Sequence, residues 1–316
     1  MSTLKLNRRT FLQTSASAAA LLVVNPLRAM EAPKISLTET SINRKNMSNL
    51  RGVQIGTITY SYRDQSNRAG DLLLYALAGG VGSVELMADG AETFAGNPGT
   101  LDLNSAAVKR TLEKFRQLGK LFRQQGVDIH ILKYSPHPGM SREQLEYVYS
   151  ACAAIGAAGL TTEMDVNGGK VVGPIAEKYG KYVIFHNHGQ PSEANFPGFD
   201  AYLRDSKAAM LNFDAGHYFG FTGNNPCDVI REYHDRIFSI HMKDKTGPKH
   251  ARPNQNMPWG QGETPIAEML QLLAENGKKQ DWPKHVDIEL EYPVPEGSTP
   301  VEEVAKCMEY CRNVLK

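Results

Sequence analysis

Leu-Asn-Phe-Asp-Ala-Gly-His at residues 211–217 and Ile-Phe-Ser-Ile-His-Met-Lys-Asp at residues 237–244 decide the fold of this chain. Each is an apolar run of strand length that ends in an acid or a histidine, and a helical segment of about three turns separates them, which is typical of a βαβ unit. In a parallel α/β fold, polar side chains at the carboxyl ends of strands face the ligand crevice. We therefore expect Asp214, His217 and His241 to meet in one pocket.

The same alternation of apolar runs and helical segments extends from residue 53 to the end of the chain. Strands are predicted at 53–60, 82–87, 127–134, 160–166, 182–188, 211–217, 237–244 and 285–291. Helices are predicted at 71–78, 105–125, 142–156, 173–179, 200–210, 265–276 and 300–314. A further helix is predicted after residue 217 and ends at residue 233. This order over about 265 residues predicts an α/β fold, a (β/α)8 TIM barrel in a single domain. A doubly wound open sheet is the alternative, but the first strand is not followed by a glycine-rich phosphate turn.

Composition narrows the possible partners. The 316 residues are 41% hydrophobic and 22% charged, with a formal net charge of +1. This composition is globular, and a charge near zero offers no basic surface for nucleic acid. We therefore expect a small, neutral ligand and no nucleic-acid partner, while the sequence leaves the oligomeric state open.

The N-terminus is predicted to lie outside the fold. Asn-Arg-Arg-Thr-Phe-Leu-Gln at 7–13 precedes a small, apolar run, and this arrangement resembles a twin-arginine export signal. We assign residues 1–29 to this signal, 30–50 to a solvated linker and 51–316 to the barrel domain. The apolar run is too short to remain as a membrane anchor. The expected location is therefore the periplasm or the exterior of the cell.

Polar residues of equal parity gather at the ends of strands four to eight, so they share the inward face. These residues are Glu163 and Asp165, His186 and His188, Asp214, His241, and Glu289 and Glu291. Several carboxylates in one place repel one another unless a cation holds them. Oxygen and imidazole ligands without cysteine suit Mn²⁺, Co²⁺, Zn²⁺ or Mg²⁺. The sequence therefore predicts one divalent metal ion at this end of the barrel.

Five motifs occur in the order found in a known family. They are Phe-His-Asn-His-Gly (185–189), Phe-Asp-Ala-Gly-His (213–217), Ile-His-Met-Lys-Asp (240–244), Trp-Gly-Gln-Gly-Glu-Thr-Pro-Ile (259–266) and Ile-Glu-Leu-Glu-Tyr-Pro (288–293). Together they resemble the xylose isomerase-like TIM barrels identified as sugar phosphate isomerases/epimerases, over roughly residues 50–316. The resemblance implies the fold, a small carbohydrate substrate and a divalent metal ion.

The resemblance also implies metal ligands. The family's epimerases use an acid on strand five, an Asp on strand six, a His on strand seven and a Glu on strand eight, which points to Asp214, His241 and Glu289. On strand five this chain has His186 and His188 instead of the acid, so the fourth ligand stays open. Glu163 or either histidine could supply it; Glu163 is favoured and His188 comes second. The choice between Glu289 and Glu291 also stays open.

The family's sugar-active members remove a proton from carbon beside a carbonyl, which a bound cation assists. The following roles are expected. Glu163 and either Glu289 or Glu291 carry the proton. His186 takes part in catalysis by orienting the hydroxyls of the sugar together with His217, and Lys133 is an electrophilic partner. Glu85 and the loop holding Trp259 close over the sugar.

Three functions follow from this site. The first is an exported, metal-dependent sugar isomerase or epimerase. The second is a lyase or hydrolase of 3-keto-glycosides, in which the same proton abstraction expels the group at carbon one. The third is a non-catalytic sugar-binding barrel, which the retained acids disfavour. The family's nuclease branch ranks last because the chain has no basic face.

Overall fold

The computed structural model describes residues 48–316. The predicted export signal at 1–29 and most of the predicted linker at 30–50 lie outside the described residues. The last three residues of that linker belong to the described structure: Ser48 is buried, and Asn49–Leu50 form strand β1. Between residues 48 and 316, none of the helices combines the length and apolar character needed to span a bilayer.

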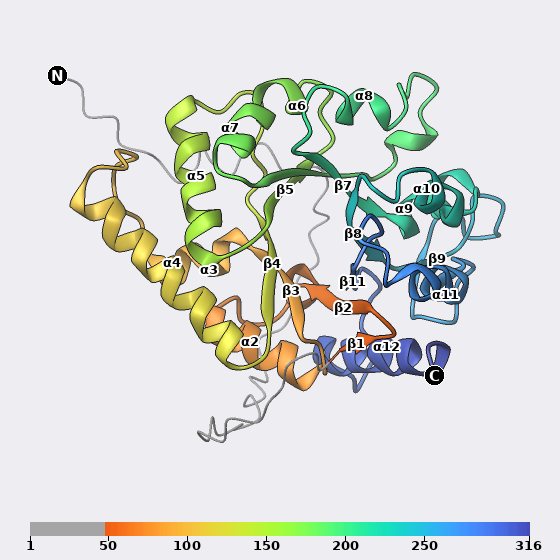
Figure 1. Ribbon diagram of the computed structural model, residues 1–316. Helices are drawn as coiled ribbons and strands as arrows, with labels where there is room; N and C mark the ends of the chain where they lie inside the picture. The colour runs from red at the N-terminus through yellow and green to blue at the C-terminus, as the bar shows by residue number, and fades with distance from the viewer. Residues whose placement is uncertain (1–47) are drawn as a thin grey trace, which may run out of the picture. The chain divides into compact units, whose positions relative to one another are not determined.

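Parallel strands close into a barrel (Figure 1). In chain order they are β2 (Val53–Ile58), β3 (Ser83–Met87), β4 (Asp128–Lys133), β5 (Gly159–Glu163), β6 (Tyr182–His186), β7 (Ala209–Asp214), β8 (Ile237–Met242) and β11 (His285–Ile288). Strand β2 pairs with both β3 and β11, so the last strand closes on the first. The short β1 pairs antiparallel with β2. The predicted (β/α)8 barrel is confirmed.

Helices surround this barrel in Figure 1. They are α2 (Ala69–Ala78), α3 (Ala88–Ala95), α4 (Ala106–Gln124), α5 (Arg142–Ile155), α6 (Gly168–Val171), α7 (Gly173–Lys178), α8 (Asp200–Leu203), α9 (Ala215–Thr222), α10 (Pro226–Glu232), α11 (Ile266–Asn276) and α12 (Pro300–Val314). Two 3-10 turns, η1 (Thr59–Tyr62) and η2 (Gln190–Ser192), and a small hairpin, β9 (Asp244–Lys245) with β10 (Asn256–Met257), complete the described structure.

One predicted helix was wrong in its length. Residues 200–210 were expected to be helical, but α8 ends at Leu203 and β7 begins at Ala209. The hydroxyl of Ser206 accepts the N–H of Ala208 and donates to the carboxylate of Glu177 on α7. Serine side chains that bond the nearby backbone in this way compete with helix propagation. The chain therefore turns here and enters the barrel earlier than predicted.

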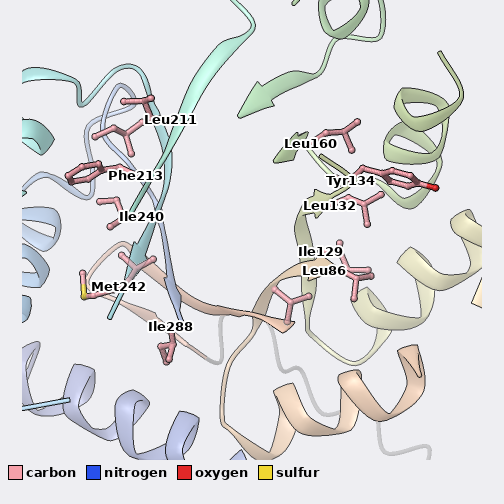
Figure 2. Close-up of a cluster of buried hydrophobic side chains, with 14 of the residues drawn as sticks. Leu86, Ile129, Leu132, Tyr134, Leu160, Leu211, Phe213, Ile240, Met242 and Ile288 are labelled. Atoms are coloured by element: carbon pink, nitrogen blue, oxygen red, sulfur yellow. The ribbon is translucent and has the colours of Figure 1, made fainter. Parts of the chain in front are cut away.

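The hydrophobic core lies between the outer face of the barrel and the helices. Alternate residues of each strand point outward and pack under the helices, as expected for a barrel of this size. Figure 2 shows Leu211 and Phe213 of β7 beside Ile240 of β8 on one side, and Leu132 of β4 near Leu160 of β5 on another. Since these outward positions are apolar, the polar residues between them on the same strands face the barrel interior.

Candidate metal centre

Four buried side chains converge at the carboxyl end of the barrel. They are His186 at the end of β6, Asp214 at the end of β7, His241 on β8 and Glu289 just after β11. Each offers a ligand atom that lies within 4.8 Å of those of the other three. We call these four residues the metal centre. Its members come from four neighbouring strands, so the closure of the barrel brings them together.

Asp214 is held in place by the backbone around it. Its Oδ1 accepts the N–H of His217 at 2.7 Å and thereby caps α9. The side chain of Asn187, directly after β6, accepts the N–H of Asp214 and donates to its carbonyl oxygen. The cap uses one carboxylate oxygen and leaves Oδ2 for the metal centre.

Two carboxylates fix the imidazole of His241. Its Nε2 lies 2.7 Å from Glu85, and its Nδ1 lies 2.7 Å from Glu289. Burial alone would lower the pKa of His241, but the charges of Glu289 and Glu85 outweigh it and raise this pKa well above its usual range. Because Nε2 faces Glu85, Nδ1 is the nitrogen on the side of the metal centre.

Lys243 places an ammonium beside the same carboxylates. Its Nζ lies 2.8 Å from Asp214 Oδ2, 2.9 Å from Glu289 Oε2 and 2.8 Å from Glu291 Oε2, and its side chain is only 2% exposed. Burial would lower the pKa of Lys243, but these three acids raise it. The same ammonium holds the pKa of Glu289 well below its usual range against the effect of burial. Lys243 therefore supplies positive charge to this group of acids.

The residues present fit a divalent cation. Nδ1 of His186 has no hydrogen-bond partner among residues 48–316, and Oδ2 of Asp214, which faces the ammonium of Lys243 at 2.8 Å, makes no contact there with hydrogen-bond geometry. Burial and the neighbouring His241 lower the pKa of His186 well below its usual range, so its imidazole is neutral, as a metal ligand must be. Two imidazoles and two carboxylates, without thiolate, suit Mn²⁺, Co²⁺, Zn²⁺ or Mg²⁺.

The two residues expected to supply the fourth ligand lie outside this group. Glu163 contacts Lys133 at 2.7 Å and His188 at 3.1 Å, and its side chain is 52% exposed. Partial burial would raise the pKa of Glu163, but His188 and Lys133 together lower it to about 2. The structure thus places His186, and neither Glu163 nor His188, beside Asp214, His241 and Glu289.

His217 and Glu291 meet at the edge of the centre. Nε2 of His217 lies 3.4 Å from Glu291 Oε2 and 3.8 Å from Asp214 Oδ2. Burial, with the charge of Lys243, lowers the pKa of His217 to about 2, so its imidazole is neutral. Glu291 belongs to no metal-ligating group among the described residues, which separates its role from that of Glu289.

Trp259 is fixed against the barrel by its loop. Its ring packs edge-on against Tyr310 of α12, with 5.8 Å between the ring centroids. Nearby, the buried carboxylate of Asp244 accepts the backbone N–H groups of Gly260, Gly262 and Thr264. These contacts anchor the loop after Trp259 to the hairpin strand β9. The expected closure of this loop over a sugar stays a prediction.

Sequence reasoning missed two residues that bear on the centre. Lys243, directly after β8, has the same parity as His241, and Asn212 has the same parity as Asp214 on β7, so parity could have indicated both. Asn212 donates a hydrogen bond of 2.8 Å to Glu85.

Glu85 lies behind the imidazole of His241, and its expected contact with the sugar stays a prediction. Glu85 is fully buried on β3 and bonds to His241 and Asn212. A carboxylate behind a metal-binding histidine fixes the orientation of its ring. Glu85 is therefore placed to orient His241.

We predict that Glu85→Gln weakens Mn²⁺ binding by roughly 10- to 100-fold, as for other residues behind metal-ligating histidines. The amide keeps the size of the side chain but removes the charge that orients His241. Isothermal titration calorimetry of Mn²⁺ binding measures the effect. Unchanged Mn²⁺ affinity with weaker sugar binding would instead support the original assignment of Glu85 to the substrate.

The C-terminal part of the chain, residues 168–313, matches the model of the family described as "Xylose isomerase-like TIM barrel". Among curated proteins, an inosose dehydratase of Clostridium botulinum is 29% identical over 80 residues, which cover 25% of this chain and 26% of that protein. A second inosose dehydratase, from Clostridium beijerinckii, is 29% identical over 75 residues, or 23% of this chain and 25% of that protein. The chain thus matches about a quarter of the length of these relatives.

Solved structures match over most of the barrel. A probable 3-DHS dehydratase involved in petrobactin synthesis, from Bacillus anthracis, has a TM-score of 0.61 and 14% identity, covering 83% of this chain and 99% of that chain. A D-psicose 3-epimerase, solved in the presence of D-fructose, has a TM-score of 0.57 and 12% identity, with coverage of 83% and 99%. At these identities the likeness shows a shared fold.

Proposed function

We propose that this chain is a divalent-metal-dependent isomerase or epimerase that moves a proton on carbon beside the carbonyl of a sugar. The observation that carries this proposal is the position of two carboxylates outside the metal centre, Glu163 and Glu291. The family match over residues 168–313 and the fold shared with an epimerase and a dehydratase support it.

Glu163 and Glu291 stand on opposite walls of the barrel. Glu163 ends β5, whereas Glu291 follows β11, as does Glu289 of the metal centre. The strand order β11-β8-β7-β6-β5 places the other three members of the metal centre on the strands between them. In a closed ring of eight strands, β5 and β11 are four steps apart in either direction. A substrate bound at the metal centre would therefore have one carboxylate on each side.

This arrangement suits proton transfer on a carbon acid. When bound, a divalent ion would polarise the substrate carbonyl and an adjacent hydroxyl, which acidifies the C–H bond of the carbon that bears this hydroxyl. One carboxylate then accepts the proton, and the same or the opposite carboxylate returns it at a neighbouring carbon or on the other face. Lys133 and His188 keep Glu163 ionised, and Lys243 donates a hydrogen bond to Glu291.

We predict that Glu163→Gln and Glu291→Gln each lower the rate of sugar interconversion by roughly 10²- to 10⁴-fold, the usual contribution of a general acid or base. The Mn²⁺-loaded protein is incubated with free aldoses and ketoses in D₂O, and deuterium at the reacting carbon is followed by NMR. Glu296→Gln, at an exposed acid in the loop after β11, is the matched control and should keep the wild-type rate. Full activity in both site variants would refute the proton-transfer roles.

Elimination is the second candidate function, and the matches to two inosose dehydratases favour it. Abstraction of the same proton would expel water, or the group at carbon one of a 3-keto-glycoside, from the neighbouring carbon. The NMR experiment separates these reactions when it includes inososes and 3-keto-glycosides. Loss of water or release of an aglycone, without an interconverted sugar, would replace the isomerase assignment.

Export through the twin-arginine pathway is also proposed, on the sequence at residues 7–13 alone. Phosphorylated sugars are scarce outside the cytoplasm, so the proposed substrate of an exported enzyme is an unphosphorylated sugar or glycoside.

A further inference from the structure

Lys243 occupies an unusual position for a lysine, because its ammonium lies among acids that would also bind the metal ion. Two of its three carboxylate partners, Asp214 and Glu289, belong to the metal centre. Only the contact with Glu291 has the geometry of a hydrogen bond. The ammonium is therefore held near Asp214 and Glu289 mainly by charge.

The surrounding backbone is shaped to admit this side chain. At Gly216 on α9, a Cβ atom would lie 2.2 Å from Cγ of Lys243 and 2.6 Å from its carbonyl oxygen. These distances are far below van der Waals contact, so a side chain at position 216 would displace the lysine. Gly216 is the second residue of α9, two positions after Asp214, which caps this helix. The absence of a side chain at Gly216 leaves the space through which Lys243 reaches the metal centre.

Charge decides what the lysine does there. Asp214, Glu289 and Glu291 carry three negative charges in a buried space, and the ammonium offsets part of their mutual repulsion. A divalent ion bound by Asp214 and Glu289 would lie within a few ångströms of the same ammonium, where like charges repel strongly because little water screens them. The same contact thus stabilises the metal-free centre and opposes metal binding.

We propose that Lys243 is an internal counter-cation of the metal centre. Its ammonium keeps the acids of the centre in place without a metal ion, and it lowers the affinity for a metal ion so that a bound ion exchanges more easily. The inference rests on the metal centre of the proposed function, and it does not depend on which sugar reaction the centre performs. A purely structural ion pair between Lys243 and Glu291 would leave the affinity for metal unchanged.

The test compares Lys243→Met with Lys249→Met. Both variants lose one positive charge in the segment after β8, but Lys249 is exposed and lies outside the centre. Mn²⁺ binding by isothermal titration calorimetry should tighten at least about tenfold in Lys243→Met, given the strength of like-charge repulsion at short range. The affinity of Lys249→Met should match the wild type. Equal or weaker Mn²⁺ binding in Lys243→Met would overturn the proposal.

Thermal unfolding supplies the second half of the test. In EDTA, Lys243→Met should unfold at a lower temperature than the wild type, and added Mn²⁺ should raise its unfolding temperature by more than it raises that of the wild type. A methionine variant as stable as the wild type in EDTA would refute the counter-cation role in the metal-free state.

A measurement on the wild-type chain covers the case in which the variant does not fold. With ¹⁵N-labelled lysine, the ammonium signal of Lys243, identified by its absence from Lys243→Arg, should shift when Mg²⁺ is added. An unmoved signal at saturating Mg²⁺ would overturn the inference. Mn²⁺ binding without any sugar conversion would refute the proposed reaction and leave the role of Lys243 intact.

Discussion

Asp214→Asn is expected to abolish sugar conversion and to weaken Mn²⁺ binding at least a hundredfold, or by about 2.7 kcal/mol. Asparagine keeps an oxygen that can accept the N–H of His217, so the cap of α9 survives. The substitution removes the anionic oxygen Oδ2, which lies within reach of the other members of the metal centre. A neutral amide cannot replace a carboxylate as a ligand for a hard divalent cation.

The measurement is the metal content of purified protein after dialysis against Mn²⁺, together with calorimetric titration. Asp228→Asn is the matched control, because this acid also lies near the start of a helix and its side chain is 75% exposed. Circular dichroism establishes that both variants are folded. Wild-type metal content and affinity in Asp214→Asn would remove the basis for a metal centre at this position.

Gly119→Ala is expected to destabilise the barrel by about 3 kcal/mol or more, in the upper range for overpacking. Gly119 lies on α4 where this helix crosses the end of α5. A Cβ atom there would sit 1.9 Å from the carbonyl oxygen of Ile155, the last residue of α5. Because that oxygen belongs to backbone and also accepts a hydrogen bond from Arg123, the two helices must separate.

Gly70→Ala is the matched control for this prediction. Gly70 is exposed on α2, and a Cβ atom there would have no heavy atom within 4 Å. Alanine restricts the unfolded chain more than glycine does, so this variant should gain about 0.5 kcal/mol. Urea unfolding of both variants measures the difference. Equal stability of Gly119→Ala and the wild type would show that α4 and α5 pack less closely than described.

Parity along the strands predicted much of the site correctly. Asp214, His241 and Glu289 were assigned to one inward-facing cluster from their positions at strand ends, and the structure brings all three together. This was possible because side chains alternate strictly between the two faces of a regular strand. The same count could not decide the fourth member, because Glu163 and His188 have the right parity as well.

Parity failed where a strand is irregular. Between β3 and β4 the register shifts, so that Val84 pairs with Ile129 but Glu85 pairs with Ile131. The extra residue is His130, and its parity, opposite to that of Lys133, would point it outward on a regular strand. Instead it bonds to Ser83 and Asp287 in the interior of the barrel. A bulge adds one residue to one strand and reverses the parity beyond it.

The barrel, its order of strands and helices, and the end of the barrel at which the polar residues gather could all be predicted from the sequence. These properties follow from apolar periodicity and from the ends of the predicted strands, which are local features. Tertiary structure alone decided that His186 completes the metal centre, that Glu85 orients His241 and that Lys243 joins the acids. The physical reason is the stagger between neighbouring strands, which sets the height of each side chain along the barrel axis. His186 pairs in register with Asn212, and Asp214 pairs with His241. The hydrogen-bond register across the closed sheet therefore decides which side chains become neighbours, and the spacing of residues along one strand carries no information about this register.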